Sequence, residues 1–137
     1  MRALLLMGSG VWIATMVSAT GLPYPVRARD ADWVAPAAQS ARTNPLADRP
    51  ETAAGGRKLF HQRCTPCHGE DARGTRRGPD LTAAAVQRQS DGALFWKITS
   101  GNTRTGMPTF SFLPDLQRWQ LLLHLRSHAG GAVRDVR

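Results

Sequence analysis

Five consecutive residues carry the strongest chemical pattern in this chain: Cys64-Thr65-Pro66-Cys67-His68. The spacing C-x-x-C-H is the pattern through which haem becomes attached to c-type proteins. The two thiols can add across the two vinyl groups of one porphyrin, and the imidazole that follows is then placed to ligate the iron. The motif therefore predicts one covalently bound haem c, anchored by Cys64 and Cys67, with His68 as a ligand of its iron.

Three other kinds of site share part of this pattern. A C-x-x-C pair also occurs in thioredoxin-like redox proteins, in zinc sites and in short-loop disulfides. A redox pair is expected within a βαβ pattern, which the sequence lacks, and a zinc site needs two further ligands at suitable spacing. The chain has no other cysteine, and His124 and His128 lie far downstream in a predicted helix. Haem attachment is the interpretation that the sequence favours, with the three alternatives left open.

Iron held by His68 has a second axial position, for which Met107 is the leading candidate. The other three methionines all lie near the N-terminus. Met107 sits between a glycine and a proline in a predicted loop, where its thioether can point inward instead of belonging to a helical stripe. The alternatives are a gap-filling methionine and His124 as the sixth ligand. A histidine–methionine pair fills both axial positions and raises the reduction potential relative to two histidines, which suits an electron carrier.

The chain divides into four segments around this site. Residues 1–19 combine a basic start with an uncharged apolar stretch, as in a cleaved signal peptide or an uncleaved membrane anchor. Residues 20–50 hold five prolines and little apolar periodicity, which predicts an extended tether. Residues 51–130 form the predicted folded domain, and residues 131–137 a C-terminal tail. The leader predicts export to the periplasm, with membrane association only if the leader is retained.

The periodicity of apolar residues predicts helices within the folded domain. Thr52 and Ser90 are the expected N-caps of two of them. One of the two glycines Gly55 and Gly56 is expected to let another helix approach closely. No stretch alternates apolar and polar residues, so the sequence predicts an all-α fold. The expected helices are residues 52–63, 82–89 (a short helix or turn), 91–100 and 115–128.

The formal net charge of +8 marks the chain as basic. Its arginines are dispersed over predicted loops and helix faces, and no platform of interleaved aromatic and basic residues is present. Nucleic acid is therefore not the expected partner. A positive face that steers docking to an acidic redox protein is the preferred interpretation.

Taken together, residues 51–128 resemble a monohaem class I cytochrome c of the bacterial periplasm. The resemblance implies the small cytochrome c fold, with three to four helices packed around one haem. It also implies that the first and last helices cross, with Gly56 and Phe60 meeting Trp119 and Leu123. The matching pieces, in the family's order, are Gly56 and Phe60, Cys64–Gly69, Gly78–Leu81, Leu94–Gly101, Met107-Pro108 and Arg118–Gln120.

The resemblance further implies a role for individual residues around the haem. Cys64 and Cys67 would carry the thioether bonds, with His68 as the proximal and Met107 as the distal ligand. The Pro79 carbonyl would accept a hydrogen bond from the second ring nitrogen of His68. The implied lining of the haem pocket is Leu81, Phe95 and Ile98, with Trp96 lining it, approaching a propionate or simply packing.

The function that follows is one-electron transfer by a monomeric carrier between periplasmic redox proteins, such as a dehydrogenase donor and an oxidase acceptor. On this interpretation the protein is not itself an enzyme. The alternatives are a haem-bearing electron-transfer subunit of a periplasmic dehydrogenase and a haem peroxidase. A peroxidase would need an open or displaceable sixth position, and a redox sensor would need an output domain, for which 137 residues leave no room.

Overall fold

The computed structural model describes residues 32–129, which form an all-α fold, as the sequence predicts. Within these residues the only β-pairing is two isolated bridges, and no helix is long and apolar enough to cross a membrane. The predicted leader (1–19) and tail (131–137) lie outside the described residues. The helices are α1 (Ala37–Ser40), α2 (Ala53–Arg63), α3 (Thr65–His68), α4 (Ala84–Gln87), α5 (Asp91–Ser100) and α6 (Asp115–Ser127), with 3-10 turns η2 (Pro50–Thr52) and η3 (Thr103–Thr105).

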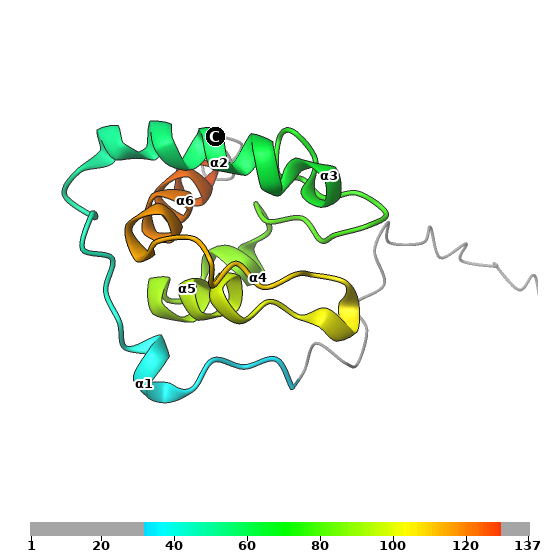
Figure 1. Ribbon diagram of the computed structural model, residues 1–137, viewed down its shortest axis with the longest axis horizontal. Helices are drawn as coiled ribbons and strands as arrows, with labels where there is room; N and C mark the ends of the chain where they lie inside the picture. The colour runs from blue at the N-terminus through cyan, green and yellow to red at the C-terminus, as the bar shows by residue number, and fades with distance from the viewer. Residues whose placement is uncertain (1–31, 130–137) are drawn as a thin grey trace, which may run out of the picture.

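The three longest helices, α2, α5 and α6, build the frame. Helix α2 lies across α6, α6 packs beside α5, and α1 lies against α5 on the side away from α2 (Figure 1). Two clusters of buried side chains fill the space between them. The first core consists of Phe60, Ala72, Phe110, Leu113, Leu121 and Leu125, and the second core of Leu46, Leu94, Phe95, Trp119 and Leu122.

The structure tests the two N-caps that the sequence predicts, at Ser90 and Thr52. Ser90 caps α5 as predicted, because its hydroxyl oxygen accepts the backbone N–H of Ala93 at 3.2 Å. Thr52 does not cap α2: its hydroxyl donates to the Arg49 carbonyl at 2.8 Å, and the chain enters α2 through the 3-10 turn η2 instead. The predicted Thr52 cap is therefore wrong.

The crossing of α2 and α6 depends on one glycine. A Cβ atom added to Gly56 would lie 1.9 Å from the carbonyl oxygen of Gln120 and 2.8 Å from the backbone nitrogen of Leu121. Only a residue without a side chain permits the two backbones to approach so closely. The prediction that one of the paired glycines has this role is confirmed at Gly56. Phe60, one turn further along α2, is buried in the first core beneath the crossing.

The segment of residues 32–50 differs from the extended tether that its prolines predict. It contains α1 and lies against the folded domain, and Leu46 is buried in the second core. The side-chain amide of Asn44 is also buried and donates to the carbonyl of Trp119 at 3.2 Å. We call these described residues the strap. Asn44 and Leu46 stand among prolines and polar residues, so the sequence pattern does not distinguish them from an unpacked linker.

A stack of rings and guanidinium groups holds the strap in place. The rings of Phe95 and Trp119 stack with centroids 3.9 Å apart, and the Arg42 guanidinium lies 4.4 Å from the Phe95 centroid. Helix α1 meets α5 at Gly92, where an added Cβ would lie 2.1 Å from the carbonyl oxygen of Gln39. The strap is therefore an integral part of the fold, held by cation–π contact and close backbone packing.

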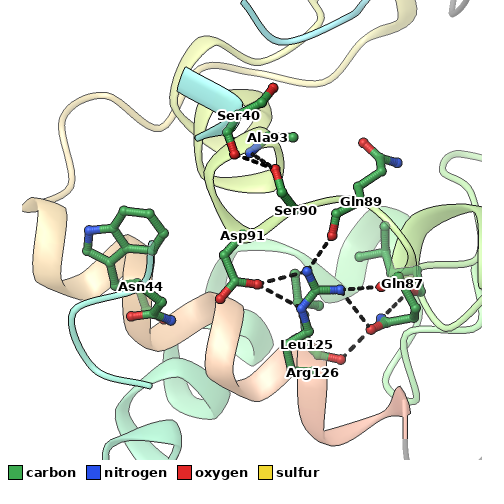
Figure 2. A network of polar contacts seen from close by, with 11 residues as sticks. Ser40, Asn44, Gln87, Gln89, Ser90, Asp91, Ala93, Leu125 and Arg126 are labelled. Atoms are coloured by element: carbon green, nitrogen blue, oxygen red, sulfur yellow. Dashed lines mark hydrogen bonds and ion pairs between the residues drawn. The ribbon is translucent and has the colours of Figure 1, made fainter. Parts of the chain in front are cut away.

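A polar network joins the end of α6 to the connection between α4 and α5 (Figure 2). The Arg126 guanidinium donates to the Asp91 carboxylate at 2.8 and 2.9 Å and to the carbonyls of Gln87 and Gln89, both at 2.6 Å. Such a planar fork can satisfy several acceptors at once, which a lysine cannot do. This network fixes the connection that leads from α4 into α5.

The close helix crossing generates a test. Gly56→Ala should lower the free energy of unfolding by about 1–3 kcal/mol or more, because the new methyl group must push α2 away from the α6 backbone. Gly55→Ala is the matched control: its Cβ would meet only the end of the Gln120 side chain, at 2.8 Å, which can move aside. Alanine has a higher helix propensity than glycine, by about 1 kcal/mol, so Gly55→Ala should be as stable as the parent protein or more stable. Denaturant unfolding measures both, and equal losses would contradict this account of the crossing.

Candidate functional site

The C-x-x-C-H motif forms a tight helical turn directly after α2. Cys64 ends α2, and the backbone N–H groups of Cys67 and His68 both donate to its carbonyl, at 3.0 and 2.9 Å. Pro66 lies in the first turn of α3, where its missing N–H leaves no bond unmade. Residues three and four positions apart share one face of a helix. The turn therefore places two thiols and one imidazole on the same side.

The thiols do not fit the alternative uses of a C-x-x-C pair. Both cysteines are free, so no disulfide closes the loop. Burial, and to a smaller degree the charge of Cys67, raise the pKa of Cys64 to about 11. A dithiol redox site needs the thiolate form, which is scarce at this pKa. Among residues 32–129 no group of three or more His, Cys, Asp or Glu side chains is arranged to hold a metal, which disfavours a zinc site.

His68 is oriented by a backbone carbonyl. Its Nδ1 lies 3.0 Å from the carbonyl oxygen of Pro79, the hydrogen bond that the family resemblance implies. Burial lowers the pKa of His68, which favours the neutral ring with a proton on Nδ1. This leaves Nε2 as the nitrogen that can bind a metal, and a carbonyl partner on the other nitrogen fixes the ring and raises its basicity.

Thr75 and Gly78 hold the loop after the motif close to Cys67 and His68. The Thr75 hydroxyl donates to the Cys67 carbonyl at 2.6 Å and accepts the N–H of Arg77 at 3.0 Å. Thr75 also closes a turn by donating its N–H to the carbonyl of Gly78. A Cβ on Gly78 would lie 3.1 Å from the His68 ring and 2.9 Å from the Cys67 carbonyl oxygen. The sequence analysis missed Thr75, because a threonine in a glycine-rich loop carries no distinctive signal.

Met107 is held by a second closed loop. Asn102 and Met107 exchange both backbone hydrogen bonds, at 2.9 and 3.0 Å, around the turn η3. Gly101 takes a positive φ of 62°, and an added Cβ there would lie 2.4 Å from the Pro108 carbonyl oxygen. The loop is thereby folded back on itself with Met107 half-buried at its end.

The motif and the methionine loop meet at the same apolar surface. Several half-buried side chains pack against the first core without being fully covered by it. They come from α2, the loop after the motif, α5 and the methionine loop, and we call them the apolar wall. Its members are Leu59, Cys64, Leu81, Ile98 and Met107. A half-exposed apolar surface that includes thiol and thioether sulfurs, next to an imidazole, fits a large planar apolar metal complex such as haem c.

Two predicted pocket residues, Phe95 and Trp96, lie outside the apolar wall, and their part in a haem pocket stays a prediction. Phe95 is buried in the second core and stacked on Trp119, between α5 and α6, and it does not belong to the apolar wall. Phe95 and Ile98 lie one turn apart on the apolar face of α5. The sequence pattern identifies this face but does not predict which neighbouring element each residue contacts. Trp96 is half-buried on α5, and its role stays a prediction. Leu81 and Ile98 do lie in the apolar wall, whereas the sequence analysis missed Leu59.

His124, the alternative sixth ligand, packs against α2. It borders an open hollow beside Pro50, Ala53 and Arg57, at the start of that helix, whereas Cys64 stands at its end. Its ring contacts Phe60 edge-on at 5.2 Å. The choice between Met107 and His124 as the partner of His68 stays a prediction.

The chain matches known proteins over this region. The profile of the family described as "Cytochrome C oxidase, cbb3-type, subunit III" matches residues 51–125, which is more than half of the chain. Among solved structures, cytochrome CL from the marine methylotrophic bacterium Methylophaga aminisulfidivorans is similar, with 27% identity and a TM-score of 0.54. That match covers 62% of this chain and 60% of the other, less than two thirds of either. No curated protein sequence matches the chain.

The geometry of the loop generates a second test. Thr75→Val keeps the shape of the side chain but removes the hydroxyl that holds the loop to the Cys67 carbonyl. We expect it to lower the free energy of unfolding by about 1–2 kcal/mol, since two hydrogen bonds are lost in a partly buried site. Thr65→Val is the control, because the exposed hydroxyl of Thr65 donates only to the His61 carbonyl within a helical turn. Chemical denaturation that finds the two variants equally stable would argue against the positioning role of Thr75.

Proposed function

The chain belongs to the cytochrome c family whose profile matches residues 51–125, and on that premise we propose that it is a one-electron carrier with His68 and Met107 as its iron ligands. Cytochromes of this family contain covalently bound haem c, which supplies one-electron redox chemistry. One observation supports the ligand assignment above all. Cys64 of the motif and Met107 of its loop both pack, half-buried, against the first core.

Each residue of the motif has a separate task in this proposal. Cys64 and Cys67 form the two thioether bonds, since they project from one face of the turn that α3 continues. His68 presents Nε2 to the iron while its Nδ1 donates to the Pro79 carbonyl. This hydrogen bond holds the ring in one orientation and increases its electron donation to a metal. The close packing of Gly78 against the ring leaves little room for another orientation.

Met107 would determine the redox behaviour of the site. A thioether is a soft ligand that favours the reduced metal, so it raises the reduction potential relative to a second histidine. With both axial positions filled, the protein offers no open position to peroxide or oxygen. This supports a carrier over a peroxidase. The closed Asn102–Met107 loop keeps the thioether in place without needing the metal.

The surface supports docking to an acidic redox partner. Three exposed arginines, Arg73, Arg76 and Arg77, lie in the loop that carries Pro79, next to the attachment turn. Together with the net charge of +8, they would steer a negatively charged donor or acceptor toward this side. We place the protein in the periplasm, on the evidence of the apolar leader in residues 1–19, with soluble redox proteins as its partners.

A second candidate is an electron-transfer subunit within a larger oxidoreductase. The description of the matching family, which names an oxidase subunit, favours it. Two large apolar side chains, Phe112 and Leu116, are more than half exposed and could contact such a partner. Co-purification of the tagged protein with a stable partner under native conditions would support the subunit, and a monomer alone would support the carrier.

Met107→Ala tests the proposed ligand set. The variant should lose the weak red absorption band that a thioether–iron bond gives in the oxidised spectrum, and its reduction potential should fall. The reduced protein should also gain the ability to bind carbon monoxide, because one axial position is opened. Optical spectra and potentiometric titration of the purified holoprotein measure these changes.

The matched variant is His124→Phe, which removes the alternative ligand and keeps an aromatic ring against Phe60. It should retain the red band and the potential of the parent protein. If the band instead survives in Met107→Ala and disappears in His124→Phe, the assignment of the sixth ligand to Met107 is wrong.

A further inference from the structure

Helix α6 ends in a second group of potential metal ligands, the pair His124 and His128. The two rings lie four residues apart on one helix face, with centroids 4.9 Å apart and edge-to-face at 73°. Their Nε2 atoms face each other at 3.5 Å. His124 is almost fully buried and His128 is half-buried. Neither residue has a part in the proposed haem site.

The separation of the two nitrogens fits metal chelation better than a hydrogen bond. Hydrogen bonds from N–H groups are usually no longer than about 3.2 Å, so 3.5 Å is long for a direct ring-to-ring bond. Two nitrogens bound to one tetrahedral metal ion at about 2.1 Å each are separated by about 3.4 Å. We propose that His124 and His128 together bind one imidazole-preferring transition-metal ion, with Zn²⁺ as the representative.

The site can be reached from solvent. His124 borders an open hollow of about 390 Å³ whose walls also include Glu51, Arg57 and Ser127. Within residues 32–129 no third His, Cys, Asp or Glu completes a ligand set. The remaining coordination positions would therefore be taken by water, as in an open site, and binding would be reversible.

The charges around the end of α6 both favour and oppose a bound metal ion. The last turn of a helix presents unpaired carbonyls and a partial negative charge, which favours a bound cation beside His124 and His128. Burial lowers the pKa of His124 to about 4, aided by the charges of His128, His61 and Arg57, so its ring is neutral at pH 7. Neutral imidazole is the form that binds a metal. The positive charge of Arg57 opposes the ion, and the carboxylate of Glu51 on the same wall offsets it.

Calorimetric titration of the holoprotein with zinc chloride, near pH 7.5 in a buffer that does not chelate, tests this proposal. We expect one Zn²⁺ site in the parent protein. His128→Ala should weaken it at least about tenfold, equivalent to about 1.4 kcal/mol. This variant alters only the end of α6 and should still fold. His124→Phe should weaken binding to a similar degree.

His61→Gln is the matched control, because His61 is already bonded to Glu70 at 2.6 Å and lies on α2. Its zinc affinity should stay within about twofold of the parent. Thermal unfolding gives a second readout: Zn²⁺ should raise the Tm of the parent and not that of His128→Ala, since an ion that binds only the folded state stabilises it. The proposal is overturned if the parent does not bind, if His128→Ala binds equally well, or if His61→Gln loses as much affinity.

None of these outcomes depends on whether His68 and Met107 ligate the haem iron. A protein with the expected Met107 spectrum and no zinc binding would refute the histidine pair alone. A protein that binds zinc through the pair but lacks the Met107 signature would refute the proposed ligand set alone.

Discussion

The domain depends on an apolar surface that residues 32–129 leave half-exposed. The members of the apolar wall lie against the first core but stay half-buried, and one of them, Cys64, belongs to the attachment motif. A domain of this size has a small hydrophobic core, because small chains bury a smaller share of their surface on folding. Small folds of this kind commonly need a covalent link or a bound group to complete them. Haem c, held through the motif, would supply the missing apolar area and link three parts of the chain.

Two loops make this surface specific for one kind of group. The loop after the motif brings the Pro79 carbonyl to His68, with Thr75 and Gly78 holding it close to the attachment turn. The methionine loop is closed by backbone hydrogen bonds of its own. Contacts within the polypeptide therefore fix the backbone of both loops. Preformed geometry of this type reduces the reorganisation that accompanies electron transfer.

The strap and the crossing of α2 and α6 stabilise the helices that carry the site. Asn44 and Leu46 attach the strap to α6 and to the second core, and Arg42 covers the stacked rings of Phe95 and Trp119. Gly56 brings α2 onto α6, which places the end of α2, and with it Cys64, next to the first core. The redox site is therefore held by contacts that run through most of the described chain.

Local signals in the sequence were sufficient for the three longest helices, α2, α5 and α6, and for the motif. Ser90 and Gly101 bound α5 because a cap and a positive φ depend on a few neighbouring atoms. The packing partner of Phe95, the docking of the strap and the role of Thr75 depend on which surfaces meet in three dimensions. Residues such as Asn44 and Thr75 are common in loops, so their type alone does not separate a structural anchor from a solvent-exposed side chain.

The central claim is that Cys64 and Cys67 covalently bind haem, and mass spectrometry tests it most directly. The protein isolated from a host that attaches haem c should be denatured, measured intact and then mapped by proteolysis. We expect one haem mass that survives denaturation and maps to the peptide containing both cysteines, and its loss in the double variant Cys64→Ala/Cys67→Ala. A polypeptide without the added mass, or an added mass that persists in the double variant, would contradict the account.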